Sequence, residues 1–227
     1  MATRPVDVAI VGGGVAGSSL GVALASAGLG VAIVEREARF RDRVRGEALH
    51  PWGAAEAAAL GLVGRLRASG GLPLPIWQRY EDRQPVEPYR WVDDVPGGHV
   101  EWGVPHAPLQ EALLAHAAGR GVLVLRPAVA TGIATASGGV EVSVESNRVP
   151  VLLRARLLVA ADGQRSATRR WLGIAARRDA ANHAIAGVLL RGGGLDRDRA
   201  HQTYPPGGMV VAFPQDGDRI RLYVVRD

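Results

Sequence analysis

Val6-Asp7-Val8-Ala9-Ile10-Val11-Gly12-Gly13-Gly14-Val15-Ala16-Gly17 is the stretch of sequence that decides the fold. Its first six residues form a short apolar run rich in β-branched side chains, which is typical of a strand buried on both faces. Small residues over 18–27 then predict a helix that ends at Gly28. A second apolar run over 31–34 completes a strand–helix–strand unit of about thirty residues. The sequence therefore predicts an α/β fold with a Rossmann-like domain.

The glycine loop at the centre of this unit is expected to bind a dinucleotide. Gly12, Gly14 and Gly17 permit a tight turn, a close approach of the backbone to a pyrophosphate, and close helix–strand packing. Backbone N–H groups near Val15 and Ala16, at the start of the helix, favour the negative charge of phosphates. These five residues are predicted to contact the cofactor.

An acidic residue follows the second strand at the spacing that such a site needs. Glu35 lies about twenty residues beyond the loop, where a carboxylate accepts hydrogen bonds from ribose hydroxyls, and Arg36 follows it. We expect both residues to belong to the cofactor site. These residues alone leave NAD, NADP and FAD open.

Asp162-Gly163 follows another apolar run, residues 157–161, for which we predict a buried strand. Ligands bind at the carboxyl ends of strands in such sheets, so this pair is a second candidate for cofactor binding. The competing interpretation is an Asp that only caps the helix after it.

Together these segments resemble the group A flavoprotein monooxygenases, the para-hydroxybenzoate hydroxylase-like family, over nearly the whole chain. The resemblance rests on the loop Gly12–Gly17 with Glu35, and on the motif Asp162-Gly163-x-x-Ser166-x-x-Arg169. In the family the second motif serves both FAD and the reductant NAD(P)H. The resemblance therefore selects FAD as the bound cofactor, with NADH or NADPH as the reductant.

The resemblance implies three further cofactor contacts. Arg45, in Arg45-Gly46-Glu47, matches the family's arginine segment, which approaches the flavin side of FAD. His106 stands where the family usually has a FAD-contacting Arg or Gln, and this departure puts its role in question. Ala130 would lie near the adenine by analogy.

The predicted secondary structure alternates between two types along the chain, which suggests two interleaved domains. Residues 1–70 and 104–178 are α/β in pattern and would form the two parts of the FAD-binding domain. Residues 71–103 and 179–227 are rich in predicted strands and would form a β-rich substrate domain. The family's third motif, a Gly-Asp before a small-residue helix, has no match here, so the sequence looks truncated and its substrate sheet incomplete.

The resemblance implies a hydroxylase that uses NAD(P)H and O2. The oxygen would pass through a flavin C4a-hydroperoxide to an aromatic or polyketide-like small molecule. No catalytic side chain can be assigned; His50, His99 and His106 are candidates by residue type alone.

Two alternatives stay open, and one is rejected. A geranylgeranyl reductase-like flavoprotein would carry Tyr-x-Trp-x-Phe-Pro, whereas residues 209–214 here are Met-Val-Val-Ala-Phe-Pro. A truncated FAD-binding fragment without turnover is the other alternative. Flavin-dependent halogenases resemble this fold but use a Lys and a Trp-x-Trp-x-Ile-Pro segment, and this chain has neither.

The composition excludes several other classes of protein. The chain has 227 residues, of which 47 % are hydrophobic and 22 % charged, as in globular proteins. No apolar run nears the length of a membrane span, and no secretion signal opens the chain, so we expect a cytoplasmic protein without membrane contact. With no Cys, thiolate catalysis and Cys-ligated metals are excluded, and we predict no metal site.

The net charge of +5 and the pI near 10.5 raise the question of nucleic-acid binding. The basic residues are all Arg, are scattered, and lack interleaved aromatic residues, so we expect no nucleic-acid partner. The absence of Lys also excludes Schiff-base chemistry. A small-molecule substrate and O2 are the expected partners, and the oligomeric state is left open.

Overall fold

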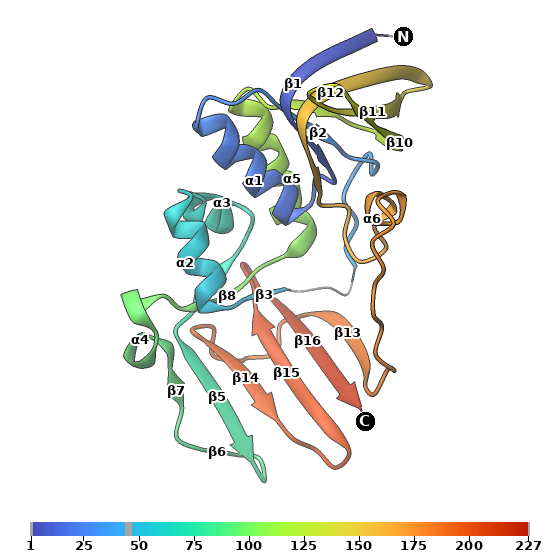
Figure 1. Cartoon of the computed structure of the whole chain (residues 1–227). Helices are drawn as coiled ribbons and strands as arrows, with labels where there is room; N and C mark the ends of the chain where they lie inside the picture. Colours follow the sequence, from blue (N-terminus) through green and yellow to red (C-terminus); the bar gives the residue numbers. More distant parts are fainter. Residues whose placement is uncertain (1, 44–46, 227) are drawn as a thin grey trace. The chain divides into compact units, whose positions relative to one another are not determined.

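The computed structural model describes residues 2–43 and 47–226, which form two compact units. The first unit combines residues 1–41 with 110–178, and the second combines 42–109 with 179–227. Each unit is therefore assembled from two separate stretches of the chain (Figure 1).

The first unit is built on a six-stranded sheet in the order β10-β11-β12-β1-β2-β9. Strands β12, β1, β2 and β9 are parallel to one another, and β10, β11 and β12 form an antiparallel meander. The strands are β1 (Ala2–Val11), β2 (Val31–Val34), β9 (Leu123–Leu125), β10 (Ala128–Ala136), β11 (Gly139–Ser146) and β12 (Val149–Ala160). The helices are α1 (Val15–Ser26), α6 (Ala167–Trp171) and most of α5 (His106–Gly119).

Apolar side chains of these strands form the core of the first unit. Every residue of β2 is buried, and Ala9, Ala32 and Leu153 have no exposed surface. The small side chains of α1 let the helix approach the sheet closely, because a Cβ at Gly21 would lie 2.8 Å from Ile33 Cδ1. Helix α1 therefore packs closely against β2.

The second unit contains a larger mixed sheet, in which only β14 and β5 pair in parallel among the described strands, and a small three-stranded antiparallel sheet. The large sheet runs β13-β16-β15-β14-β5-β6, with β7 also paired to β5, and the small sheet runs β3-β8-β4. The strands of the large sheet are β5 (Ile76–Glu81), β6 (Gln84–Pro85), β7 (Tyr89–Arg90), β13 (Ala184–Arg191), β14 (Arg199–Thr203), β15 (Gly208–Pro214) and β16 (Arg219–Arg226). The remaining elements are β3 (Ala48–Leu49), β4 (Leu72–Leu74), β8 (Glu101–Gly103), α2 (Pro51–Ala59), α3 (Val63–Ala68), α4 (Trp91–Asp94) and a 3-10 turn (Pro96–Gly98).

The observed α/β fold confirms the predicted fold class, and two local expectations need correction. Helix α1 begins at Val15, three residues before the predicted start, because Gly14 serves as its N-cap. The run 157–161 lies at the end of β12, but it is not a buried strand: Leu157 is 57 % exposed. Apolar composition alone did not distinguish this strand end from the covered strands of the sheet.

Candidate functional site

The glycine loop joins β1 to α1 and has no room for side chains at its key positions. Gly12 has φ +108°, a backbone conformation that residues with a Cβ rarely adopt. A Cβ at Gly12 would overlap the carbonyl oxygen of Ala161, and one at Gly17 would overlap the oxygen of Gly12. The glycines therefore allow three backbone segments to meet closely.

The start of α1 presents backbone N–H groups that the helix itself does not use. Gly14 is the N-cap, and the first helical hydrogen bond runs from Ser18 N–H to Gly14 O at 2.9 Å. The N–H groups of Val15, Ala16 and Gly17 precede that bond. Ser18, which is fully buried, donates from Oγ to Gly13 O at 2.8 Å and so holds the loop in place. The arrangement suits a phosphate group.

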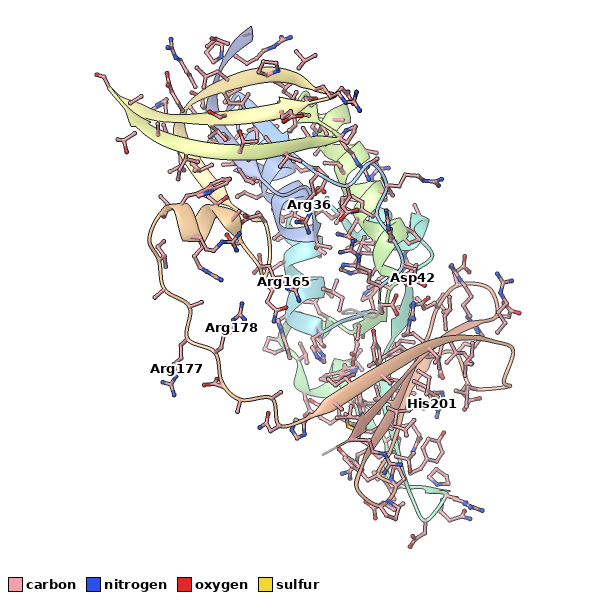
Figure 2. The ribbon with its side chains drawn as sticks, turned by 90° about the vertical axis from the view of Figure 1, so that its right-hand side faces the viewer. Arg36, Asp42, Arg165, Arg177, Arg178 and His201 are labelled. Carbon is pink, nitrogen blue, oxygen red and sulfur yellow. The ribbon has the colours of Figure 1, made fainter. Side chains whose placement is uncertain are left out.

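Glu35 follows β2 and is fixed against the glycine loop by backbone groups. One carboxylate oxygen accepts the Gly13 N–H at 2.7 Å, and the other accepts the Glu37 N–H at 2.7 Å. Glu35 is only 6 % exposed. A carboxylate offers about four acceptor positions, so capacity is left for the hydroxyls of a ribose. The neighbouring Arg36 extends outward with 70 % of its side chain exposed (Figure 2).

Asp162 lies just beyond β12 and has one oxygen engaged and one left over. Oδ2 accepts hydrogen bonds from the N–H groups of Ala167 and Thr168 at 2.7 and 3.0 Å, and from Thr168 Oγ1 at 3.2 Å. Oδ1 is buried and has no hydrogen-bond partner in the described part of the chain. Burial opposes the charge, but the hydrogen bonds that the turn before α6 donates outweigh it and lower the pKa of Asp162. The result is an ionised carboxylate with one oxygen ready to accept a hydrogen bond.

The sheet brings the two carboxylates to opposite sides of the glycine loop. The Gly12 N–H donates to Val34 O at 2.8 Å on the β2 side, and the Ala161 N–H donates to Val11 O at 2.8 Å on the β12 side. Glu35 and Asp162 each follow one of these flanking parallel strands. This edge, at the carboxyl ends of parallel strands, is where ligands bind in open α/β sheets.

The other predicted cofactor residues lie in different parts of the structure. Ala130 lies on β10 in the first unit, two residues after Ala128, whose N–H donates to Glu35 O at 2.8 Å. Gly163 has φ +80° and accepts the Ser166 N–H through its carbonyl. His106 begins α5 within the second unit. Arg45 lies outside the described residues.

An ion pair between Arg126 and Glu111 holds the chain segment that follows Glu35, and the sequence did not predict this pair. Arg126 makes two hydrogen bonds to the Glu111 carboxylate, at 2.6 and 2.9 Å, and its Nε donates to Glu37 O. Glu111 also accepts the Phe40 N–H at 2.8 Å. The Arg126 hydrogen bonds lower the pKa of Glu111 more than partial burial raises it. No local motif marks these residues, because Phe40 and Glu111 are 71 positions apart.

The second unit contains a buried ion pair that the sequence analysis also missed. Arg221 on β16 pairs with Glu47 and donates to Asp42 at 2.7 Å. Glu47 and Arg221 are 1 % and 4 % exposed. Burial raises the pKa of Glu47, although Arg221 opposes that rise. Burial, together with the nearby Glu47 charge, raises the pKa of Tyr223 to about 12, so the phenol keeps its proton.

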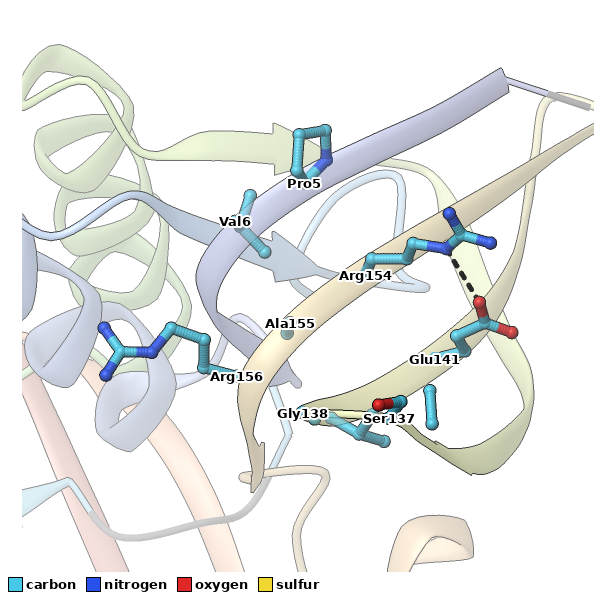
Figure 3. A pocket seen from close by; sticks show the side chains of 11 residues that line it. Pro5, Val6, Ser137, Gly138, Glu141, Arg154, Ala155 and Arg156 are labelled. Atoms are coloured by element: carbon cyan, nitrogen blue, oxygen red, sulfur yellow. Dashed lines mark hydrogen bonds and ion pairs between the residues drawn. The ribbon is translucent and has the colours of Figure 1, made fainter.

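A separate surface hollow is found at the other end of the first unit. Figure 3 shows it between the strands β1 and β12 and the turn at 137–139, with an Arg154–Glu141 ion pair of 2.7 Å. None of the predicted cofactor residues lines it. It therefore does not compete with the glycine loop as the candidate site.

The described residues contain neither a metal-binding cluster nor a membrane-spanning helix. No cluster of three or more His, Asp or Glu side chains there could hold a metal ion. None of the helices in that part of the chain has the length and apolar character to cross a membrane.

The comparison with protein families gives the site its context. Residues 5–223 match the family model described as "FAD binding domain". The chain belongs to this family. The family assignment agrees with the resemblance to group A flavoprotein monooxygenases that the two motifs indicated.

Similar proteins include several oxygenases. The "2-heptyl-3-hydroxy-4(1H)-quinolone synthase" of Mycobacteroides abscessus is 33 % identical over 231 residues, which is 96 % of this chain and 57 % of that protein. The "Ubiquinone hydroxylase UbiL" of Rhodospirillum rubrum is 28 % identical over 236 residues, covering 97 % of this chain and 52 % of the relative. The p-nitrophenol 4-monooxygenase PnpA of Pseudomonas putida DLL-E4 has a TM-score of 0.86 at 19 % identity, covering all of this chain and 59 % of its own, and shows the shared fold. The chain spans a little over half the length of these relatives.

The geometry of the first unit fits FAD. The close-packed glycine loop and the unused N–H groups of α1 suit a pyrophosphate, and Glu35 suits a ribose. Asp162 Oδ1 is buried and has no partner in the described chain, so it is free to accept a hydrogen bond from a ligand hydroxyl.

Proposed function

We propose that the protein is an FAD-dependent monooxygenase that hydroxylates a small molecule, with NADH or NADPH as the reductant and O2 as the oxidant. Membership of the FAD binding domain family and the hydroxylases among the similar proteins support this activity. The observation that carries the proposal is the glycine loop flanked by Glu35 and by Asp162, whose Oδ1 is buried and unsatisfied. The relatives named as a quinolone synthase and a ubiquinone hydroxylase favour an aromatic or polyketide-like substrate.

Each part of the proposed site has a definite task. The N–H groups of residues 15–17 hold the pyrophosphate, Glu35 accepts hydrogen bonds from a ribose, and Arg36 lies beside it. Asp162 accepts a hydroxyl hydrogen bond through Oδ1 while its other oxygen fixes the turn before α6. Ala130, Gly163, His106 and Arg45 remain proposed contacts.

FAD, when bound, supplies the transfer of electrons from NAD(P)H and the activation of O2. The protein's own contribution is positioning and the exclusion of water. The backbone groups that hold Glu35 and Asp162 fix both carboxylates before the ligand arrives, so little ordering is left for binding.

The test begins with the absorption spectrum of the purified chain, before and after FAD is added and excess flavin removed. We expect a protein-bound flavin band, followed by oxidation of NADH or NADPH with uptake of O2. Asp162→Asn should weaken flavin binding, whereas Asp218→Asn, which changes an exposed residue of the second unit, should not. A chain that binds no flavin would contradict the proposed site.

A bound flavin without any NAD(P)H oxidation would instead support the alternative of a flavin-binding chain without turnover. The flavin band thus tests the binding site and NAD(P)H oxidation tests the activity, so the failure of one is distinguished from the failure of the other.

A further inference from the structure

Glu101 is a buried carboxyl group to which the proposed flavin site gives no role. It lies on β8, in the middle of the small sheet between β3 and β4, and has no exposed surface. Both of its side-chain oxygens are buried and have no hydrogen-bond partner in the described part of the chain. An ionised carboxylate in such a place is strongly disfavoured. Burial accordingly raises the pKa of Glu101 to about 8, so it holds a proton at neutral pH.

The imidazole ring of His50 lies close to this carboxyl group. Its Nδ1 lies 3.4 Å from Glu101 Oε1, a separation that a small rotation of the ring would shorten to a hydrogen bond. The His50 side chain is 44 % exposed, and burial lowers its pKa, which favours the neutral ring. His50 therefore connects a fully buried acid to the surface of the second unit.

The surroundings of the pair hold the ring and contribute little charge. The indole of Trp52 stacks on His50 with ring centroids 4.7 Å apart. Strands β3 and β4, which flank β8, contain no titratable residue. On α2 the acid is Glu56, which is exposed, and on α3 the guanidinium of Arg67 lies over the Trp102 ring at 5.1 Å.

We propose that Glu101 and His50 form a proton-exchange site for a bound small molecule. The site donates a proton to an oxygen anion of that molecule, of the phenolate or enolate class. In the resting pair, the Glu101 hydroxyl donates to Nδ1, so the ring hydrogen is on Nε2. When the Nε2–H bond breaks and an O–H bond forms on the ligand, the Glu101 proton moves to Nδ1. The pair is left as a carboxylate that accepts the Nδ1–H, and a proton from solvent restores it.

The class of ligand rests on the proposed function, because an oxygenated aromatic or polyketide-like molecule presents such anions. The exchange between the two side chains does not depend on flavin. It is therefore measured on the purified chain without FAD, and its outcome is distinct from that of the flavin-binding test.

The experiment is a pH titration of the chain labelled with 15N in its histidines, using NMR spectra that distinguish hydrogen on Nδ1 from hydrogen on Nε2. At neutral pH, below the pKa of Glu101, we expect neutral His50 with its hydrogen on Nε2. As Glu101 ionises near pH 8, the hydrogen should move to Nδ1, where the carboxylate accepts it. The ring is thus expected to change tautomer without gaining charge.

Two variants and one control complete the design. Glu101→Gln keeps the shape of the side chain but cannot ionise, so the tautomer change should disappear. Glu101→Leu should give His50 the mixed tautomers of a solvated ring, and the exposed Glu56→Gln on α2 should behave as the unmodified chain. If Glu101→Leu does not fold, Glu101→Gln still decides the question. The proposal is overturned if His50 keeps one tautomer from about pH 6 to 9, or if Glu101→Gln leaves the change intact.

Discussion

The two units of the molecule hold their buried and partly buried carboxyl groups with different kinds of partner. In the first unit, backbone N–H groups from neighbouring loops hold Glu35 and Asp162. In the second unit, Glu47 is held by the side chain of Arg221, and Glu101 lies 3.4 Å from the His50 ring. Backbone donors carry no charge of their own, and they leave both side chains in the first unit with acceptor positions for ligand hydroxyls. A charged partner, or a retained proton, neutralises the second pair.

The kind of partner that holds each carboxylate determines what that carboxylate can do. A carboxylate fixed by N–H groups is organised before its ligand arrives, which is the requirement of a binding site. A carboxylate paired with a buried guanidinium ties strands together, and removal of the partner leaves an uncompensated charge.

Arg221→Met should destabilise the protein by about 3–5 kcal/mol, because it leaves Glu47 buried without its cation. Equilibrium unfolding in urea measures the change. Arg191→Met, on an exposed position of β13, is the matched control and should change the free energy of unfolding by less than about 0.5 kcal/mol. Equal losses in the two variants would show that Glu47 does not depend on Arg221.

Gly17→Ala should destabilise the first unit by about 1–3 kcal/mol, because its Cβ would overlap the backbone oxygen of Gly12. The same displacement should abolish measurable FAD binding, which titration of flavin fluorescence detects. Gly119→Ala is the control, since a Cβ at that end of α5 meets nothing within 4 Å. Normal flavin affinity in Gly17→Ala would remove the loop from the site.

The comparison of the units also explains what the sequence could predict. The glycine loop and Glu35 follow from local rules, because a short strand, three glycines and an acid about twenty residues later specify one turn and one sheet edge. The buried end of β2 and the helix after the loop are equally local. These features are legible without any knowledge of distant residues.

The ion pairs of both units could not be predicted in this way. Glu47 and Arg221 are 174 positions apart, and they meet only because β16 joins a sheet built from distant strands. The Glu111–Arg126 pair forms only where α5 lies beside the segment between β9 and β10. Leu157 was misjudged for the related reason that exposure depends on the packing around the end of a strand, and not on its composition.

Asp162→Asn should weaken FAD binding about 10- to 100-fold, a loss of about 1.5–3 kcal/mol that is usual for a hydrogen bond to a charged group. The amide keeps the volume of the side chain but loses the charge, and its nitrogen cannot accept a hydrogen bond. Asp218→Asn should leave the affinity unchanged. An unchanged affinity in Asp162→Asn would mean that Oδ1 receives no ligand, and that the contrast between the units does not extend to binding.

Glu111→Gln should have the smallest effect, about 1 kcal/mol at pH 7, because the Glu111 side chain is 41 % exposed and solvent screens its pair with Arg126. The folded-state pKa of Glu111 is lowered, so the unfolded chain binds its proton first as the pH falls. The stabilisation is therefore present above the unfolded pKa of about 4.5 and disappears as the pH falls through the lower folded value. Urea unfolding at pH 7 and near pH 3 should show the difference between Glu111→Gln and the unmodified chain shrinking toward zero, while the exposed Glu145→Gln on β11 shows little difference at either pH. If the difference persisted in acid, Glu111 would stabilise the protein by the packing of its side chain. The charge of its pair with Arg126 would then contribute nothing to stability.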